Sequence, residues 1–165
     1  GAGGVVGGTR GETQEQPVVY VTRSTAGPSA ASERLRIGTH WGFAHHRGTW
    51  ALLDVEMDVR LGEGFCLDAG VGTRMVEGFY PHAYWRAGFK VRWYPKVVQA
   101  YFSLNFMQYF EDLEMGPRAA VGVDVVIPSM KNFYFNFETG GGVLFETSSD
   151  VFGVFHAQGG VGMRF

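Results

Sequence analysis

The chain has 165 residues, a length that suits a single domain, and a formal net charge of −2. It contains 25 glycines and 14 phenylalanines, whereas charged residues make up only 18% of the chain, a smaller share than soluble domains usually have. This charge balance, without a basic cluster, argues against a nucleic-acid partner. The single cysteine, Cys66, excludes an internal disulfide.

The first 33 residues differ in composition from the rest of the chain. They are rich in glycine, serine and alanine, and only Val18, Val19, Tyr20 and Val21 have the composition of a short strand. Such a segment has too little apolar surface to fold alone, so residues 1–33 are expected to form a flexible tail. Its short apolar run could add as a strand to the exposed sheet edge of a partner.

Residues 34–165 show regular alternation of apolar and polar residues, separated by short groups of turn residues. A two-residue period is typical of β-strands that have one apolar and one polar face. Segments of about ten residues have the length that crosses a bilayer at a tilt. No helix is predicted. The predicted strands cover approximately residues 35–44, 50–61, 65–76, 82–93, 98–110, 118–127, 133–145 and 153–165.

The last predicted strand shows this pattern most clearly. Phe155, Val161, Met163 and Phe165 share its apolar face, and the given sequence stops on the aromatic residue. This resembles the C-terminal strand of bacterial outer-membrane β-barrels, in which the last residue is typically phenylalanine. The resemblance implies that Phe165, Met163 and Val161 form the signal that the barrel-assembly machinery recognises.

No run of about 18 apolar residues predicts a transmembrane helix, so a membrane protein of this composition would have to be a closed barrel. Glycines on the polar face favour placing that face inside, where they leave room for long side chains. The bulky apolar face would then contact lipid. Aromatic residues near predicted strand ends support this orientation: Trp85 and Phe110 toward one rim, and Trp93, Phe133 and Phe165 toward the other. The alternative is a soluble, lipocalin-like ligand-binding barrel with the apolar face inside.

The inward polar face carries charges that must be paired if they are buried. We interpret these charges as a structural plug; the alternative is a narrow channel for ions or small solutes. Arg34, Arg60, Arg92, Arg118 and Arg164 share this face by register. The predicted luminal charge network comprises Arg36, Asp54, Glu56, Asp58, Asp68, Arg74, Arg86, Lys90, Asp124 and Glu138.

No group of residues indicates catalysis, a cofactor or a metal. The histidines lack the compact spacing with acids or cysteines that a zinc site requires. An enzyme acting on lipid would need a nucleophile and a base on the outer face or the rim. The outer face is expected to offer only the polar residues Thr39, Thr73, Gln108 and Thr139, so we expect no enzyme activity.

Residues 34–165 resemble the small eight-stranded outer-membrane barrels of the OmpA-like and OmpX-like kind, on strand number, period, charged lumen and the terminal Val161-Gly-Met-Arg-Phe165. The resemblance implies an antiparallel up-and-down transmembrane barrel in the bacterial outer membrane, with both termini in the periplasm. It also implies a structural, anchoring or partner-docking role. The expected partners are outer-membrane lipid, the assembly machinery and, through residues 1–33, another envelope protein. The predicted connections are short, which argues against an adhesin or receptor.

Overall fold

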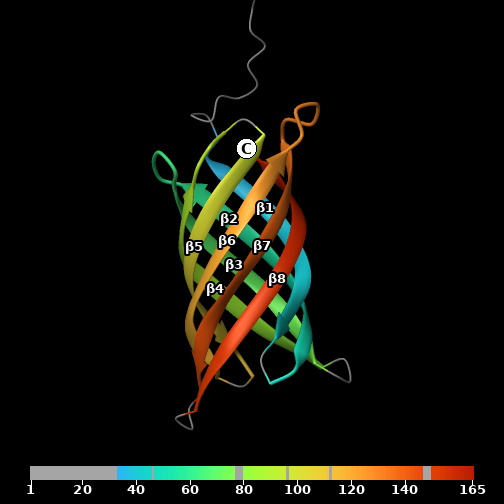
Figure 1. Cartoon of the computed structure of the whole chain (residues 1–165), viewed down its shortest axis with the longest axis vertical. Coiled ribbons are helices and arrows are strands. Elements are labelled where there is room, and N and C mark those ends of the chain that lie inside the picture. Colours follow the sequence, from blue (N-terminus) through green and yellow to red (C-terminus); the bar gives the residue numbers. More distant parts are fainter. Residues whose placement is uncertain (1–32, 46, 77–79, 96, 112, 147–149) are drawn as a thin grey trace, which may run out of the picture.

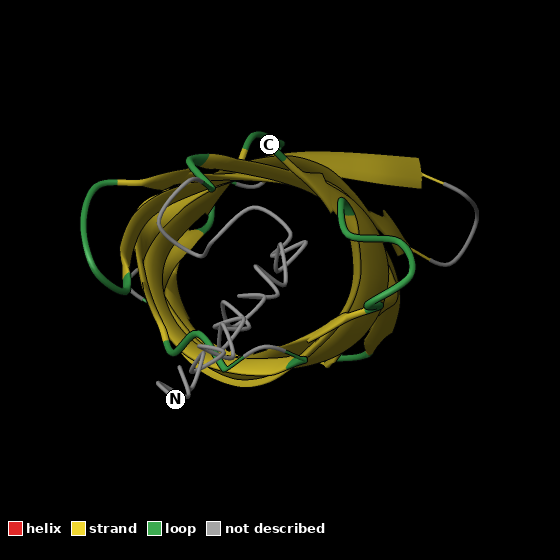
Figure 2. Cartoon of the chain, turned by 90° about the horizontal axis from the view of Figure 1, so that it is seen from above, coloured by secondary structure: helices red, strands yellow, loops and turns green. Residues whose placement is uncertain are grey.

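The computed structural model describes residues 33–45, 47–76, 80–95, 97–111, 113–146 and 150–165. They form one closed, antiparallel β-barrel (Figures 1 and 2). In chain order its strands are β1 (Leu35–His45), β2 (Thr49–Arg60), β3 (Phe65–Val76), β4 (Tyr80–Arg92), β5 (Val98–Tyr109), β6 (Met115–Val126), β7 (Phe133–Phe145) and β8 (Val151–Arg164). Each strand pairs with the next, and β8 pairs with β1. The predicted eight-stranded, up-and-down barrel is confirmed.

The seam between β1 and β8 closes with backbone hydrogen bonds that continue past the end of β8. The amide nitrogen of Phe165 donates to the carbonyl of Leu35 at 2.8 Å, and the Phe165 carbonyl accepts from the amide of Arg34 at 2.9 Å. Closure matters because an open sheet edge would leave unpaired backbone groups facing lipid. None of the described residues forms a helix long and apolar enough to cross a membrane.

The barrel has two rims, and at each rim short connections join successive strands. The termini rim holds Leu35, Phe165 and the strand ends that flank residues 61–64, 93–97 and 127–132 in the sequence. The hairpin rim holds the strand ends that flank residues 46–48, 77–79, 110–114 and 146–150. In Figure 1 the termini rim is at the top, next to the C-terminus. The longest connection is 127–132, so neither rim carries a long loop.

The start of β6 differs from the prediction. The dipeptide Gly116-Pro117 suggested a turn and a strand beginning at Arg118, but β6 begins at Met115, and Pro117 pairs with Phe106 of β5. Proline has no amide hydrogen to donate to a second neighbour. Accordingly, the pairing with β7 stops after Met115 and resumes at Arg118. Proline is tolerated here because it interrupts only one of the two ladders.

The apolar side chains point outward, as the glycine argument predicted. Val71 is 61% exposed, Phe137 59% and Trp93 58%, whereas the charged residues of the opposite face are almost fully buried. Of the aromatic residues predicted near rims, Trp93, Phe133 and Phe165 lie at the termini rim, and Phe110 lies just beyond β5 at the hairpin rim. A soluble barrel with an apolar interior does not fit this arrangement.

Candidate functional site: the filled lumen

Arg86 is the centre of the luminal charges. From β4, its guanidinium reaches Asp68 on the adjacent β3, with Nη1 2.9 Å from Oδ2, and Glu56 on the non-adjacent β2, with Nη2 2.5 Å from Oε2. Its Nε lies 3.5 Å from Oδ2 of Asp54. All four residues are at most 2% exposed. One buried cation therefore neutralises carboxylates from two strands.

From Glu56 the charges continue toward the termini rim. Lys90 Nζ lies 2.5 Å from Glu56 Oε1 and 3.0 Å from Asp58 Oδ1. Arg92 joins Asp58, at 2.8 Å, to Asp124 of β6, at 2.9 Å. Asp124 also accepts from Nη1 of Arg36 at 2.5 Å. Residues of β1, β2, β4 and β6 are thus connected across the lumen through alternating charges.

A second branch gathers around Glu138 of β7. Its Oε1 is bound by the guanidinium of Arg118 and lies 3.2 Å from Nε2 of His156, and its Oε2 accepts from the hydroxyl of Tyr101 at 2.9 Å. Asn136 donates both to the Tyr101 hydroxyl and to Asp124, each at 2.7 Å. The amide of Asn136 therefore joins the two branches into one network.

Asp54 extends the network toward the hairpin rim. Nδ1 of His40 lies 2.9 Å from its Oδ1, and the Tyr84 hydroxyl donates to its Oδ2 at 3.0 Å. Arg74 lies farther along the same direction, pairs with Glu114 at 2.9 Å and stacks over the ring of Tyr109 at 4.0 Å. All ten residues of the predicted charge network are therefore buried, and each is engaged in an ion pair.

Two residues at the termini rim differ from the sequence interpretation. Arg34 was placed in the lumen by register, but it is exposed. It precedes β1, where the alternation has not yet begun, and Glu33 takes the inward position instead. Glu33 was assigned to the tail, yet its buried carboxylate binds the guanidinium of Arg36 and lies 3.3 Å from Nη1 of Arg164. The neighbouring Arg60 is half-buried, with its guanidinium over the ring of Tyr94.

The luminal glycines provide the space for the large side chains. Tyr84, Tyr101 and Tyr134 each lie directly opposite a glycine on the neighbouring strand, namely Gly72, Gly122 and Gly162. A Cβ added to these glycines would lie 2.7, 2.4 and 2.3 Å from Cζ of the facing tyrosine, closer than real contacts allow. The narrow interior therefore has room for these large side chains because the residues opposite them carry no side chain.

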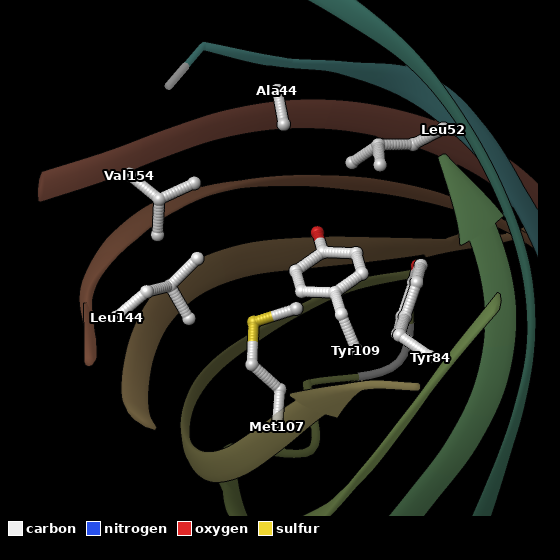
Figure 3. Packing of buried hydrophobic residues seen from close by; sticks show 7 residues of the cluster. All are labelled: Ala44, Leu52, Tyr84, Met107, Tyr109, Leu144 and Val154. Atoms are coloured by element: carbon white, nitrogen blue, oxygen red, sulfur yellow. The ribbon is translucent and has the colours of Figure 1, made fainter. Parts of the chain in front are cut away.

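An apolar cluster fills the hairpin-rim end of the lumen, a feature that the sequence interpretation missed. Leu144 is fully buried, and the side chains converge from β1, β2, β4, β5, β7 and β8 (Figure 3). The cavity between this cluster and Arg118 and His156 measures about 10 Å³, room for one water at most. The cluster comprises Ala44, Leu52, Tyr84, Met107, Tyr109, Leu144 and Val154.

Three carboxylates form the closest approach to a metal site in the described part of the chain. Oxygen atoms of Glu56, Asp58 and Asp68 lie within 4.8 Å of one another. Arg86 and Lys90 already bind all three, so the protein's own cations supply the compensating charge. These three carboxylates therefore form ion pairs with the protein's own basic side chains and do not form a metal site.

Cys66 is buried on β3, near the termini rim. Its Sγ lies 3.7 Å from the hydroxyl of Tyr94 and 4.0 Å from Nη1 of Arg92. Tyr94 belongs to the connection after β4, and partial burial together with the nearby thiol raises the pKa of its hydroxyl. The thiol packs inside the barrel mouth.

The remaining predicted residues lie elsewhere. Phe165, Met163 and Val161 are on the outer face of β8 and its extension, next to β1. The possible docking segment Val18–Val21, like most of the predicted tail, lies outside the described residues.

No protein-family model matches the sequence, and no curated protein matches it. Solved structures do resemble the barrel. Neisserial surface protein A (NspA) superimposes with a TM-score of 0.54 at 12% identity, over 81% of this chain and 97% of that one. The N-terminal barrel domain of Pseudomonas aeruginosa OprF gives a TM-score of 0.53 at 11% identity, over 81% and 99%. The Yersinia pestis attachment invasion locus protein Ail, solved with sucrose octasulfate, gives 0.44 at 12% identity, over 81% and 97%. This chain therefore has the fold of the small eight-stranded outer-membrane β-barrels.

Proposed function

We propose that this protein is an integral outer-membrane barrel with a structural, anchoring or partner-docking role, and that its lumen is sealed. The distribution of polarity carries the proposal. Large apolar side chains cover the outside, while the inside holds paired charges, joined at the hairpin-rim end by an apolar cluster. Water as the outer solvent would leave this apolar surface exposed at a large cost in free energy. In hydrocarbon, both faces are satisfied.

The proposal includes a direction of insertion. Both chain ends of the barrel lie at the termini rim. Because the terminal strand resembles those that finish at the periplasmic rim of outer-membrane barrels, we place this rim in the periplasm. Residues 1–32 would then extend into the periplasm, and Val18–Val21 would be available to pair with the sheet edge of another envelope protein. We further propose that Val161, Met163 and Phe165 are the residues that the barrel-assembly machinery reads during insertion.

The test is to refold the full chain into lipid vesicles and to record its conductance in planar bilayers. We expect folding only with detergent or lipid, strand-dominated circular dichroism, a gel mobility that changes on boiling, and no single-channel steps. A detergent-free, monodisperse monomer would contradict the membrane assignment. Discrete conductance steps from the folded protein would replace the sealed barrel by the narrow channel.

A further inference from the structure

The outer wall of the barrel is hollowed on one side. The hollow measures about 960 Å³ and lies over β5–β8 and β1. Small residues, including Val121, Ala157 and Gly159, and larger aromatic ones, including Trp41 and Phe102, line it. The hollow is shallow and open to the outside, and its lining is mostly apolar, so it offers an apolar ligand a broad surface of contact.

The hollow lies within reach of the termini rim. Trp93, in the connection after β4, lines it, and Phe137 lines it four residues along β7 from Phe133 at the rim. Its far end, at Phe43, lies eight residues along β1 from Leu35 at the rim. At about 3.3 Å per residue on a strand tilted by about 45°, this is a depth of about 19 Å. One leaflet of a hydrocarbon core roughly 30 Å thick is about 15 Å deep. An acyl chain whose headgroup sits at the termini rim would therefore lie along the hollow over the full depth of that leaflet.

The two rims carry opposite charge among the described residues that are exposed or half-buried. The hairpin rim has Glu111, Glu146 and Asp150 against Arg47, and the termini rim has Arg34, Arg60, Lys131 and Arg164 against Glu63. Three of the basic residues belong to the rim ends of the strands that carry the hollow. Lys131 belongs to the β6–β7 connection, Arg164 ends β8, and Arg34 precedes β1.

We propose that this side of the barrel binds one anionic phospholipid, with its phosphate at Lys131 and Arg34 and an acyl chain in the hollow. The charge at the rim favours an anionic headgroup over a zwitterionic one, and the hollow requires an attached acyl chain, so free phosphate would not bind in its place. The proposal rests on the membrane assignment above. It assigns the hollowed wall and the basic rim to one ligand, a lipid of the leaflet that the termini rim faces.

The test uses the full chain, refolded in detergent and mixed with phosphatidylglycerol and phosphatidylcholine that carry identical acyl chains. Bound lipid is measured by native mass spectrometry on the folded fraction. The wild-type protein should retain phosphatidylglycerol in preference. Lys131→Gln and Arg34→Gln should each lower that preference about fivefold, the equivalent of about 1 kcal/mol per basic residue at an anionic surface. Arg47→Gln, at the hairpin rim, should leave it unchanged.

A second pair of variants tests the hollow itself. Val121→Trp places a bulky ring within it, and Val71→Trp adds the same bulk at a similarly exposed position on β3, outside the hollow. The first should abolish retention of both lipids, and the second should not. Equal retention of the two lipids by the wild-type protein, or equal behaviour of the two tryptophan variants, would overturn the site.

The same binding and folding experiments have three other possible outcomes. If Val121→Trp changes the oligomeric state instead of lipid retention, a second copy of the chain occupies the hollow and the lipid proposal fails. If the chain folds without detergent or lipid, the membrane assignment fails with it. If it folds in vesicles of either lipid with no preference in binding, only the lipid site is lost.

Discussion

The charge network and the apolar cluster close the lumen by different physical means. Toward the termini rim, Glu56, Arg86 and Lys90 belong to a network in which every charge depends on particular partners at fixed distances. Toward the hairpin rim, Leu144 and Met107 belong to a cluster in which any apolar side chain of the right volume would serve. Truncation should therefore leave an unpaired charge in the network and an empty space in the cluster.

The ion-pair network and the apolar cluster should lose stability in different ways when a side chain is substituted. A buried ion pair contributes little net stability compared with an apolar pair of similar volume, but removing one partner is costly because the other stays charged and buried. An apolar cluster loses contacts in proportion to the volume removed. The network should thus be sensitive to the identity of its side chains, and the cluster to their size.

The largest effect should come from Glu56→Ala. This substitution leaves both Arg86 and Lys90 short of a carboxylate inside the barrel, and breaking a buried pair typically costs about 3–5 kcal/mol. Urea titration of the protein in detergent or vesicles would measure the loss in free energy of unfolding. Glu63→Ala, in the exposed connection after β2, is the control and should be near neutral. Equal behaviour of the two variants would mean that the luminal ion pairs are dispensable.

In the apolar cluster, Leu144→Ala should cost about 3 kcal/mol, within the range for a buried leucine, because it leaves an apolar cavity. Such a cavity stays dry and accepts small apolar solutes. Benzene should therefore restore part of the unfolding free energy of Leu144→Ala, measured by the same titration, but none of that of Glu56→Ala. Rescue of both variants, or of neither, would remove the distinction between the network and the cluster.

Gly122→Ala should cost about 2 kcal/mol by overpacking, since the new Cβ would lie 2.4 Å from Cζ of Tyr101. The change adds no charge and removes no contact, so it tests the available space alone. Gly153→Ala in β8 is the matched control, because nothing lies within 4 Å of its added Cβ. Thermal or urea unfolding would compare them. Tyr101→Leu should partly relieve Gly122→Ala, and failure to do so would place the strain elsewhere.

Much of the fold could be predicted because a membrane barrel imposes a two-residue period on every strand. Strands 65–76 and 133–145 were predicted with their observed bounds, and the inward or outward direction of their residues followed from the period. The luminal charges could be named for the same reason. That these charges are paired across the lumen could be predicted, but not which partner each one has, because Arg86 meets Glu56 of a non-adjacent strand only through the stagger and closure of the barrel.

The luminal residues that the sequence did not predict each have a local explanation. Glu114 was assigned to a connection because Gly116-Pro117 suggested a turn, although it shares the inward register of Arg118 once β6 is extended through Pro117. Glu33 gave no signal, because its inward position arises from the chain's entry into β1 rather than from alternation. The apolar cluster was overlooked because inward residues such as Leu52 and Leu144 interrupt the polar face, and a luminal position demands only that space be filled.

The smallest effect should come from Asp150→Asn at the hairpin rim. Asp150 lies 3.6 Å from the guanidinium of Arg47, but both side chains are more than half exposed. Exposed pairs contribute about 0–1 kcal/mol because water and salt already screen their charges. Arg47 also keeps its position over the ring of Phe152, 3.4 Å from the centroid, after the substitution. The matched comparison is Asp58→Asn, which removes the same charge from the buried carboxylate between Lys90 and Arg92. In urea titrations Asp150→Asn should change the free energy of unfolding by less than about 0.5 kcal/mol, and Asp58→Asn by several times more. Similar losses for the two would mean that the number of ion pairs, and not their burial, determines the stability of this barrel.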